Sequence, residues 1–270
     1  WLAQRFEAIA AQSGGRLVVE QQAESVPCAR SGMPTSVPIV NVLATLRGTS
    51  DPQRVYVVGG HYDSRNSRGE DGQGAAPGAV DDASGTAVAL EVCRVLAEHS
   101  FPATIVFAAY DGEEQGLLGS RAHARLLAER QARVDGMLAC DVVGNTLGMD
   151  GQRHDRHVRC FSYAPSGNDS FGRSLARAVT RAGREHVPGF DVMLVLRGDR
   201  YGRGGDHRSF FDQGFPAVRL TEPREDFSRQ HADVGQRDGA PYGDLPEFCD
   251  FAYTANVARV VAATLFELAS

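Results

Sequence analysis

Histidine and carboxylate side chains follow three apolar runs of this sequence, each at the point where a buried strand is predicted to end. In chain order, these residues are His61, Asp63, Glu113, Glu114 and Asp141. In an open α/β sheet, ligands bind outside the carboxyl ends of the strands, so we expect these side chains to meet at one edge of the sheet. Nitrogen and oxygen ligands of this kind suit zinc, and cobalt or manganese can replace it. The pattern therefore predicts a metal centre.

Two further residues can join this set. Asp81 lies in the loop that enters a predicted helix at Ser84, and His231 lies in a polar loop before the final helix. Taken singly, each has an ordinary explanation: Asp81 beside Asp82 could simply cap the helix, and His231 could be a solvated loop residue. The carboxylate pair after the second strand could equally favour a helix dipole. The combination in one chain, at strand ends, argues for metal binding instead.

Local geometry gives these residues different roles. In an extended segment, residues two apart point to the same side, so Asp63 can reach the imidazole of His61. A carboxylate that accepts one ring N–H leaves the other ring nitrogen free for a metal. Adjacent Glu113 and Glu114 point apart in an extended backbone, so we expect them to take different roles rather than chelate one ion together.

The order of these motifs resembles the M28 family of zinc aminopeptidases. The resemblance extends from about Asn41 to the last helix, and its DDASG and DGEEQGLLGS segments are the most specific. It implies the fold of the zinc exopeptidases, in which helices cover both faces of a mostly parallel, mixed sheet. The matching segments are GGHYDS at Gly59, PGAVDDASGTA at Pro77, YDGEEQGLLGS at Tyr110, CDVVGN at Cys140, RGGDHRSFFDQGFPAVRLTE at Arg203 and RQHADV at Arg229.

The same resemblance assigns the metal ligands. It implies that Asp81 bridges two zinc ions and that the peptide bond to the next aspartate is cis. His61 and Asp141 would complete one zinc site, and Glu114 and His231 the other. Three carboxylates and a bridging hydroxide would then balance the four positive charges of the two ions.

The resemblance also implies the catalytic roles. Glu113 would be the general base, which takes a proton from the attacking water and returns it to the leaving amine. Asp63 would orient His61. Tyr201 lies near the position of a tyrosine that steadies the developing oxyanion in the family, although the spacing here is one residue longer. Apart from the resemblance, Asp206 and His207 could shape the wall of the pocket or simply anchor the helix that follows them.

The implied activity is hydrolysis of the N-terminal peptide bond of peptides that have a free N-terminus. Two alternatives stay open. A glutaminyl cyclase shares this fold but uses one zinc and departs from the DDASG pattern. A non-catalytic binding module on the same fold would lose ligands or the base, whereas here both histidines and all the carboxylates are present.

Composition excludes several other classes of protein. The 270 residues fit one domain, and 34 acidic against 28 basic residues give a net charge of −6, which argues against a nucleic-acid binder. Every basic residue is arginine, so neither a pyridoxal Schiff base nor a P-loop lysine can form. The five cysteines include no CxxC pair, and one disulfide involving Cys28 or Cys249 is open. No apolar run spans a membrane. The start at Trp1 without Met favours a mature form, and we expect a periplasmic or extracellular monomer.

Strands that alternate with helices are needed to bring these residues to one edge. Hydrophobic periodicity predicts a first helix from Leu2 that ends at Gly14-Gly15. The pattern predicts an α/β fold with a mostly parallel central sheet and helices on both faces, in a single domain over residues 1–270. Strands are predicted at 17–20, 40–46, 55–58, 103–109, 136–142, 158–163, 192–196 and 217–220, and further helices at 84–98, 117–129, 170–182 and 245–268.

Overall fold

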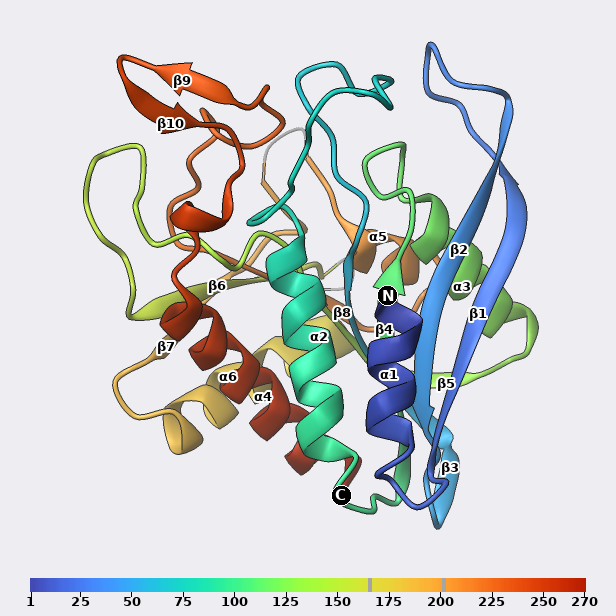
Figure 1. Cartoon of the computed structure of the whole chain (residues 1–270). Helices are drawn as coiled ribbons and strands as arrows, with labels where there is room; N and C mark the ends of the chain where they lie inside the picture. Colours follow the sequence, from blue (N-terminus) through green and yellow to red (C-terminus); the bar gives the residue numbers. More distant parts are fainter. Residues whose placement is uncertain (165–166, 201–202) are drawn as a thin grey trace.

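A mixed eight-stranded sheet forms the centre of the molecule (Figure 1). The computed structural model describes residues 1–164, 167–200 and 203–270. The sheet has the strand order β1-β2-β4-β3-β5-β8-β6-β7. Its strands are β1 (Leu17–Pro27), β2 (Ser36–Leu46), β3 (Asp51–His61), β4 (Ala103–Tyr110), β5 (Arg133–Cys140), β6 (His157–Ser162), β7 (Asp191–Val195) and β8 (Ala217–Thr221).

The four central strands β4, β3, β5 and β8 are parallel, and antiparallel pairs join them to the outer strands. All eight residues of β4 are buried, as expected for a continuously apolar strand covered on both faces. β1 and β2 form the antiparallel edge on one side. On the other side β6 is antiparallel to β8 and parallel to β7.

Helices cover both faces of this sheet, as Figure 1 shows. Helices α1, α2, α4 and α6 pack over the larger apolar core, and α3 and α5 pack over the smaller core on the opposite face. In α2, Val88, Val92 and Leu96 recur every four residues and form the buried stripe. The predicted fold class is confirmed. The helices are α1 (Leu2–Ala10), α2 (Ala83–Leu96), α3 (Leu118–Glu129), α4 (Phe171–His186), α5 (Asp206–Asp212) and α6 (Phe251–Ala269).

Several element boundaries differ from the predicted ones. The last helix begins at Phe251 rather than at 245, because Asp250 caps it by accepting a hydrogen bond from the backbone N–H of Tyr253 at 3.1 Å. The residues before it form a short 3₁₀ turn, Pro246–Phe248. A small hairpin of β9 (Gly235–Arg237) and β10 (Ala240–Tyr242) was not predicted, because its three-residue strands are exposed and carry no apolar alternation.

The structure also bears on the cysteines and on membrane-spanning helices. All five cysteines are free thiols, so the disulfide that the sequence left open does not form. Within the described residues, none of the helices combines the length and the apolar character that crossing a membrane requires.

The parallel register places the ends of three strands side by side. His61, the last residue of β3, pairs with Tyr110 at the end of β4, and Gly59 pairs with Ala139 of β5. Asp141 follows β5 directly. The segment between β3 and α2 and the β9–β10 hairpin lie at the same end of the molecule, at the top of Figure 1.

Candidate metal centre

Six of the predicted residues gather into two adjoining triads at this edge of the sheet. In each triad, the potential ligand atoms lie within 4.8 Å of one another. Adjacent glutamates are divided between the two groups, as their opposite orientations in the sequence suggested. The first triad is His61, Glu113 and Asp141, and the second is Asp81, Glu114 and His231.

Asp81 lies between the two imidazoles and faces both. Its Oδ1 is 3.2 Å from Nε2 of His61, and its Oδ2 is 3.1 Å from Nε2 of His231. On the outer sides, Asp141 Oδ1 lies 3.9 Å from His61 Nε2, and Glu114 Oε1 lies 2.8 Å from His231 Nε2. One carboxylate can therefore serve two ions, each completed by one imidazole and one further carboxylate.

His61 is held in the tautomer that metal binding requires. Its Nδ1 donates to the main-chain oxygen of Asp63 at 3.0 Å, which leaves Nε2 free to face the site. The Asp63 carboxylate stands farther off, at 3.5 Å from Nδ1. That carboxylate instead accepts the backbone N–H groups of Glu113 and Glu114, both at 3.0 Å. Asp63 thus links the end of β3 to the loop that carries the two glutamates.

Asp82 fixes three backbone segments around the site. Its buried carboxylate accepts hydrogen bonds from the N–H groups of His61 at 3.1 Å, Gly85 at 3.0 Å and Val142 at 3.1 Å. Asp82 is therefore the cap of α2, and the peptide bond before it is cis, as the resemblance implies. Gly85 must lack a side chain, because a Cβ atom there would lie 1.9 Å from the main-chain oxygen of Cys140.

A second carboxylate, from far along the chain, fixes the loop that carries Asp81. The Oδ1 and Oδ2 atoms of Asp244 accept the N–H groups of Val80 and Asp81, each at 2.8 Å. Asp244 itself follows the β9–β10 hairpin. Sequence reasoning missed this residue because an aspartate in a Gly- and Pro-containing loop carries no distinguishing pattern.

Two arginines that the sequence analysis did not single out contact the ligand set. Arg219 is fully buried, and its Nη2 lies 3.0 Å from Asp141 Oδ1. Arg65 donates from Nε to Glu114 Oε2 at 2.9 Å and from Nη2 to His231 Nδ1 at 2.6 Å. Arg219 stands between apolar residues of β8, and a charged residue inside an apolar strand is a signal of a buried ion pair.

The carboxylates dominate the electrostatics of the site. Burial opposes protonation of both imidazoles, yet Glu113 and the other carboxylates raise the pKa of His61 well above its usual range. Burial lowers the pKa of His231 as well, but hydrogen bonds and charge from Asp81 and Glu114 outweigh it and raise this pKa to about 9. The two imidazoles in turn lower the pKa of Asp81, against the effect of its burial. The site therefore stabilises positive charge, whether carried by protons or by metal ions.

The donor set fits zinc. It offers one imidazole nitrogen and several carboxylate oxygens to each of two positions, without a cysteine. Arg65 donates to Oε2 of Glu114, whereas the buried Oε1 faces the imidazole of His231, so Oε1 is placed to bind the same metal as that imidazole. Burial raises the pKa of Glu113 well above its usual range. His61 opposes this shift, and Asp141, Asp206 and Glu114 add to it, so bound cations would bring this pKa down again.

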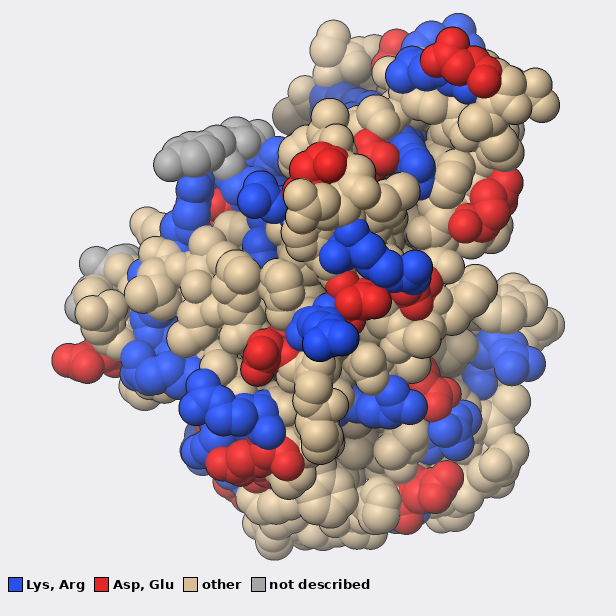
Figure 2. Space-filling view, turned by 90° about the vertical axis from the view of Figure 1, so that its left-hand side faces the viewer, with Lys and Arg blue, Asp and Glu red and all other residues tan. Residues whose placement is uncertain are grey.

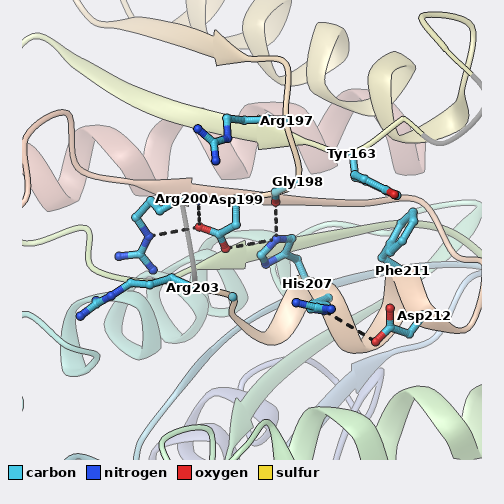
Figure 3. Close-up of a pocket in the computed structure, with 11 residues that line it drawn as sticks. Tyr163, Arg197, Gly198, Asp199, Arg200, Arg203, His207, Phe211 and Asp212 are labelled. Carbon is cyan, nitrogen blue, oxygen red and sulfur yellow. Dashed lines mark hydrogen bonds and ion pairs between the residues drawn. The ribbon is translucent and has the colours of Figure 1, made fainter.

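A cleft of about 190 Å³ opens onto the two triads, and a second hollow of about 480 Å³ adjoins it (Figure 3). Tyr163 and Phe211 pack edge to face on one wall of the second hollow, with ring centres 4.2 Å apart. One helical turn before Phe211, His207 Nε2 donates to the main-chain oxygen of Gly198 at 2.9 Å. Asp206, the residue before His207, is fully buried, and its charge contributes to the raised pKa of Glu113. Tyr201 lies outside the described residues.

Comparison with known proteins gives the family. The model of Peptidase family M28 matches residues 41–248. A probable zinc metalloprotease of Leptosphaeria maculans is 44% identical over 284 residues, which cover 99% of this chain and 66% of that protein. The chain belongs to peptidase family M28. It is thus a member of a family of zinc metallopeptidases, and it spans 59% to 66% of the length of the first curated relatives.

Solved structures confirm the M28 fold. The Legionella pneumophila LapA aminopeptidase matches with a TM-score of 0.71 at 21% identity, over 100% of this chain and 64% of that one. The glutaminyl cyclase of Porphyromonas gingivalis matches with a TM-score of 0.68 at 19% identity, over 99% of this chain and 88% of that one. Both likenesses concern the fold alone.

Proposed function

We propose that this M28 chain is an exopeptidase that binds two zinc ions and hydrolyses the N-terminal peptide bond of peptides. The observation that carries the proposal is the position of Asp81, whose two oxygens face two imidazoles at 3.2 and 3.1 Å. A carboxylate shared in this way, with one imidazole and a further carboxylate on either side, supports a two-metal centre.

Glu113 is the proposed general base. A bound zinc pair would lower the pKa of a shared water and polarise the scissile carbonyl. Glu113 lines the cleft beside Asp81, Glu114 and Asp141, where its carboxylate can accept a proton from the attacking water. The same carboxylate can then deliver that proton to the departing amine. Asp63 holds the backbone of Glu113 in place, and Arg219 holds Asp141.

The lining of the cleft supports action at the N-terminus of a peptide. Its carboxylates, from Asp81, Glu113, Glu114 and Asp141, favour the positively charged α-amino group of a substrate with a free N-terminus.

The glutaminyl cyclase reading is the second candidate. It is favoured by the extent of the fold match, which covers 88% of the Porphyromonas gingivalis enzyme. Against it stands the completeness of both triads, because a one-zinc enzyme has no need of the second.

One experiment separates these readings. The zinc-loaded protein is incubated with one peptide that begins with leucine and one that begins with glutamine, and mass spectrometry follows the products. We expect stepwise loss of N-terminal residues from both peptides, abolished by a chelator. Loss of ammonia alone from the glutamine peptide would replace our proposal with the cyclase. An absence of any product, in a protein without measurable zinc affinity, would support a binding module.

A further inference from the structure

An arginine-lined hollow of about 520 Å³ adjoins the metal cleft. It shares Glu113, Glu114, Arg203 and Gly204 with that cleft, so the two spaces are continuous. We call it the arginine hollow. The other basic residues that line it are Arg30, Arg121 and Arg208.

The positive charge of this hollow is not neutralised by the protein. Among the described residues that line it, the acidic ones are Glu113 and Glu114, and both belong to the candidate metal centre. Within the described part of the chain, no carboxylate forms an ion pair with Arg30, Arg121 or Arg203. Arg208 reaches one only at 4.0 Å, between two exposed side chains.

Neutral partners hold two of these arginines in position. Arg203 donates to Gln230 Oε1 at 3.3 Å, and its guanidinium carbon lies 5.0 Å from the centre of the Phe227 ring. Arg30 donates to the main-chain oxygen of Glu114. Such contacts order a guanidinium group without cancelling its charge, so it keeps the capacity to bind an anion.

Many arginines elsewhere have carboxylate partners. Arg125, one turn farther along the same helix as Arg121, pairs with Glu24 at 2.8 Å and with Glu129 at 2.9 Å. On the face shown in Figure 2, blue arginine patches lie beside red carboxylate patches. The arginine hollow differs because its unpaired charges converge beside the proposed base.

We propose that the arginine hollow binds a substrate carboxylate next to the cleaved bond, so that the enzyme favours acidic peptides. This inference rests on the proposed exopeptidase function. A carboxylate is the matching group because guanidinium donates two parallel hydrogen bonds to it. Glu113 lines both the hollow and the metal cleft, so an anion bound in the hollow lies beside the proposed base.

Three pairs of peptides distinguish three sources of that carboxylate. For each pair, kcat/KM of the zinc-loaded protein is compared between the two peptides. The first pair has Asp or Asn as its first residue, in Asp-Leu-Ala-Ala and Asn-Leu-Ala-Ala amides. The second has Glu or Gln as its second residue, in Leu-Glu-Ala-Ala and Leu-Gln-Ala-Ala amides. The third is Leu-Ala as the free acid or the amide. We expect a preference of about tenfold for the carboxylate member of at least one pair, reduced by salt.

The double variant Arg121→Gln with Arg203→Gln tests whether the hollow is responsible. It should abolish most of the preference, whereas the control Arg125→Gln, on the same helix but outside the hollow, should keep it. If all peptides are cleaved and kcat/KM is nearly the same for the two members of every pair, the inference is overturned and the exopeptidase proposal stays intact. An unchanged preference in the double variant would overturn the inference as well. Failure to cleave any peptide would instead refute the proposed function, and the inference with it.

Discussion

Asp82 offers a sharp test of how the site is positioned, because one buried carboxylate serves three backbone N–H groups. Oδ1 accepts from Gly85 and Val142, and Oδ2 accepts from His61. Asp82→Ala removes all three hydrogen bonds. Asp82→Asn keeps an oxygen for two of them and turns an amide donor toward the third. The two variants should therefore destabilise the protein to different degrees.

The magnitude follows from the cost of an unsatisfied buried donor, about 1–3 kcal/mol each. Burial raises the pKa of Asp82 well above its usual range. His61 opposes this shift, while Asp141 and Asp81 add to it, so removing the charge also relieves repulsion. We therefore expect the lower end of the range, a loss of unfolding free energy of about 3 kcal/mol for Asp82→Ala and about 1 kcal/mol for Asp82→Asn.

Urea unfolding in the presence of a chelator measures this loss without the contribution of bound metal. Asp238→Asn is a matched control, because Asp238 is exposed in the hairpin and asparagine tolerates its φ of 53°. The control should change the free energy by less than about 0.5 kcal/mol. Equal losses for the two Asp82 variants, or a loss below about 1 kcal/mol for Asp82→Ala, would refute the reasoning.

Three other predictions follow from the site. Glu113→Gln should keep its zinc content while kcat falls by about 10²–10⁴, measured by metal analysis and peptide hydrolysis; near-normal turnover would exclude it as the base. Zinc must displace the proton of His231, whose pKa is about 9, so affinity in chelator competition should rise with pH and level off above 9; a flat profile would contradict this. Asp244→Ala leaves the N–H groups of Val80 and Asp81 unsatisfied, so the free energy of unfolding should fall by about 2 kcal/mol or more and zinc affinity should weaken. Unchanged zinc affinity would show that the loop carrying Asp81 keeps its conformation without Asp244.

Local patterns were sufficient for the central part of the fold. Apolar runs such as 103–109 can satisfy burial on both faces only as inner strands, and the structure places β4 there. The boundaries were less predictable. The polar edge strand β1 extends to Pro27, well beyond its apolar start, because pairing with β2 stabilises exposed residues that have no strand signal of their own.

The sequence by itself determined the residue types of the candidate metal centre and their order, because a histidine or carboxylate that directly follows a buried strand lies at the edge of the sheet. It also determined that Glu113 and Glu114 separate, since their backbone orientations differ. Only the tertiary structure decided which groups support them. Asp244 and Arg219 reach the site from distant parts of the chain, and the hydrogen bond to His61 comes from a main-chain oxygen. Such contacts depend on three-dimensional distance, which no local spacing in the sequence records.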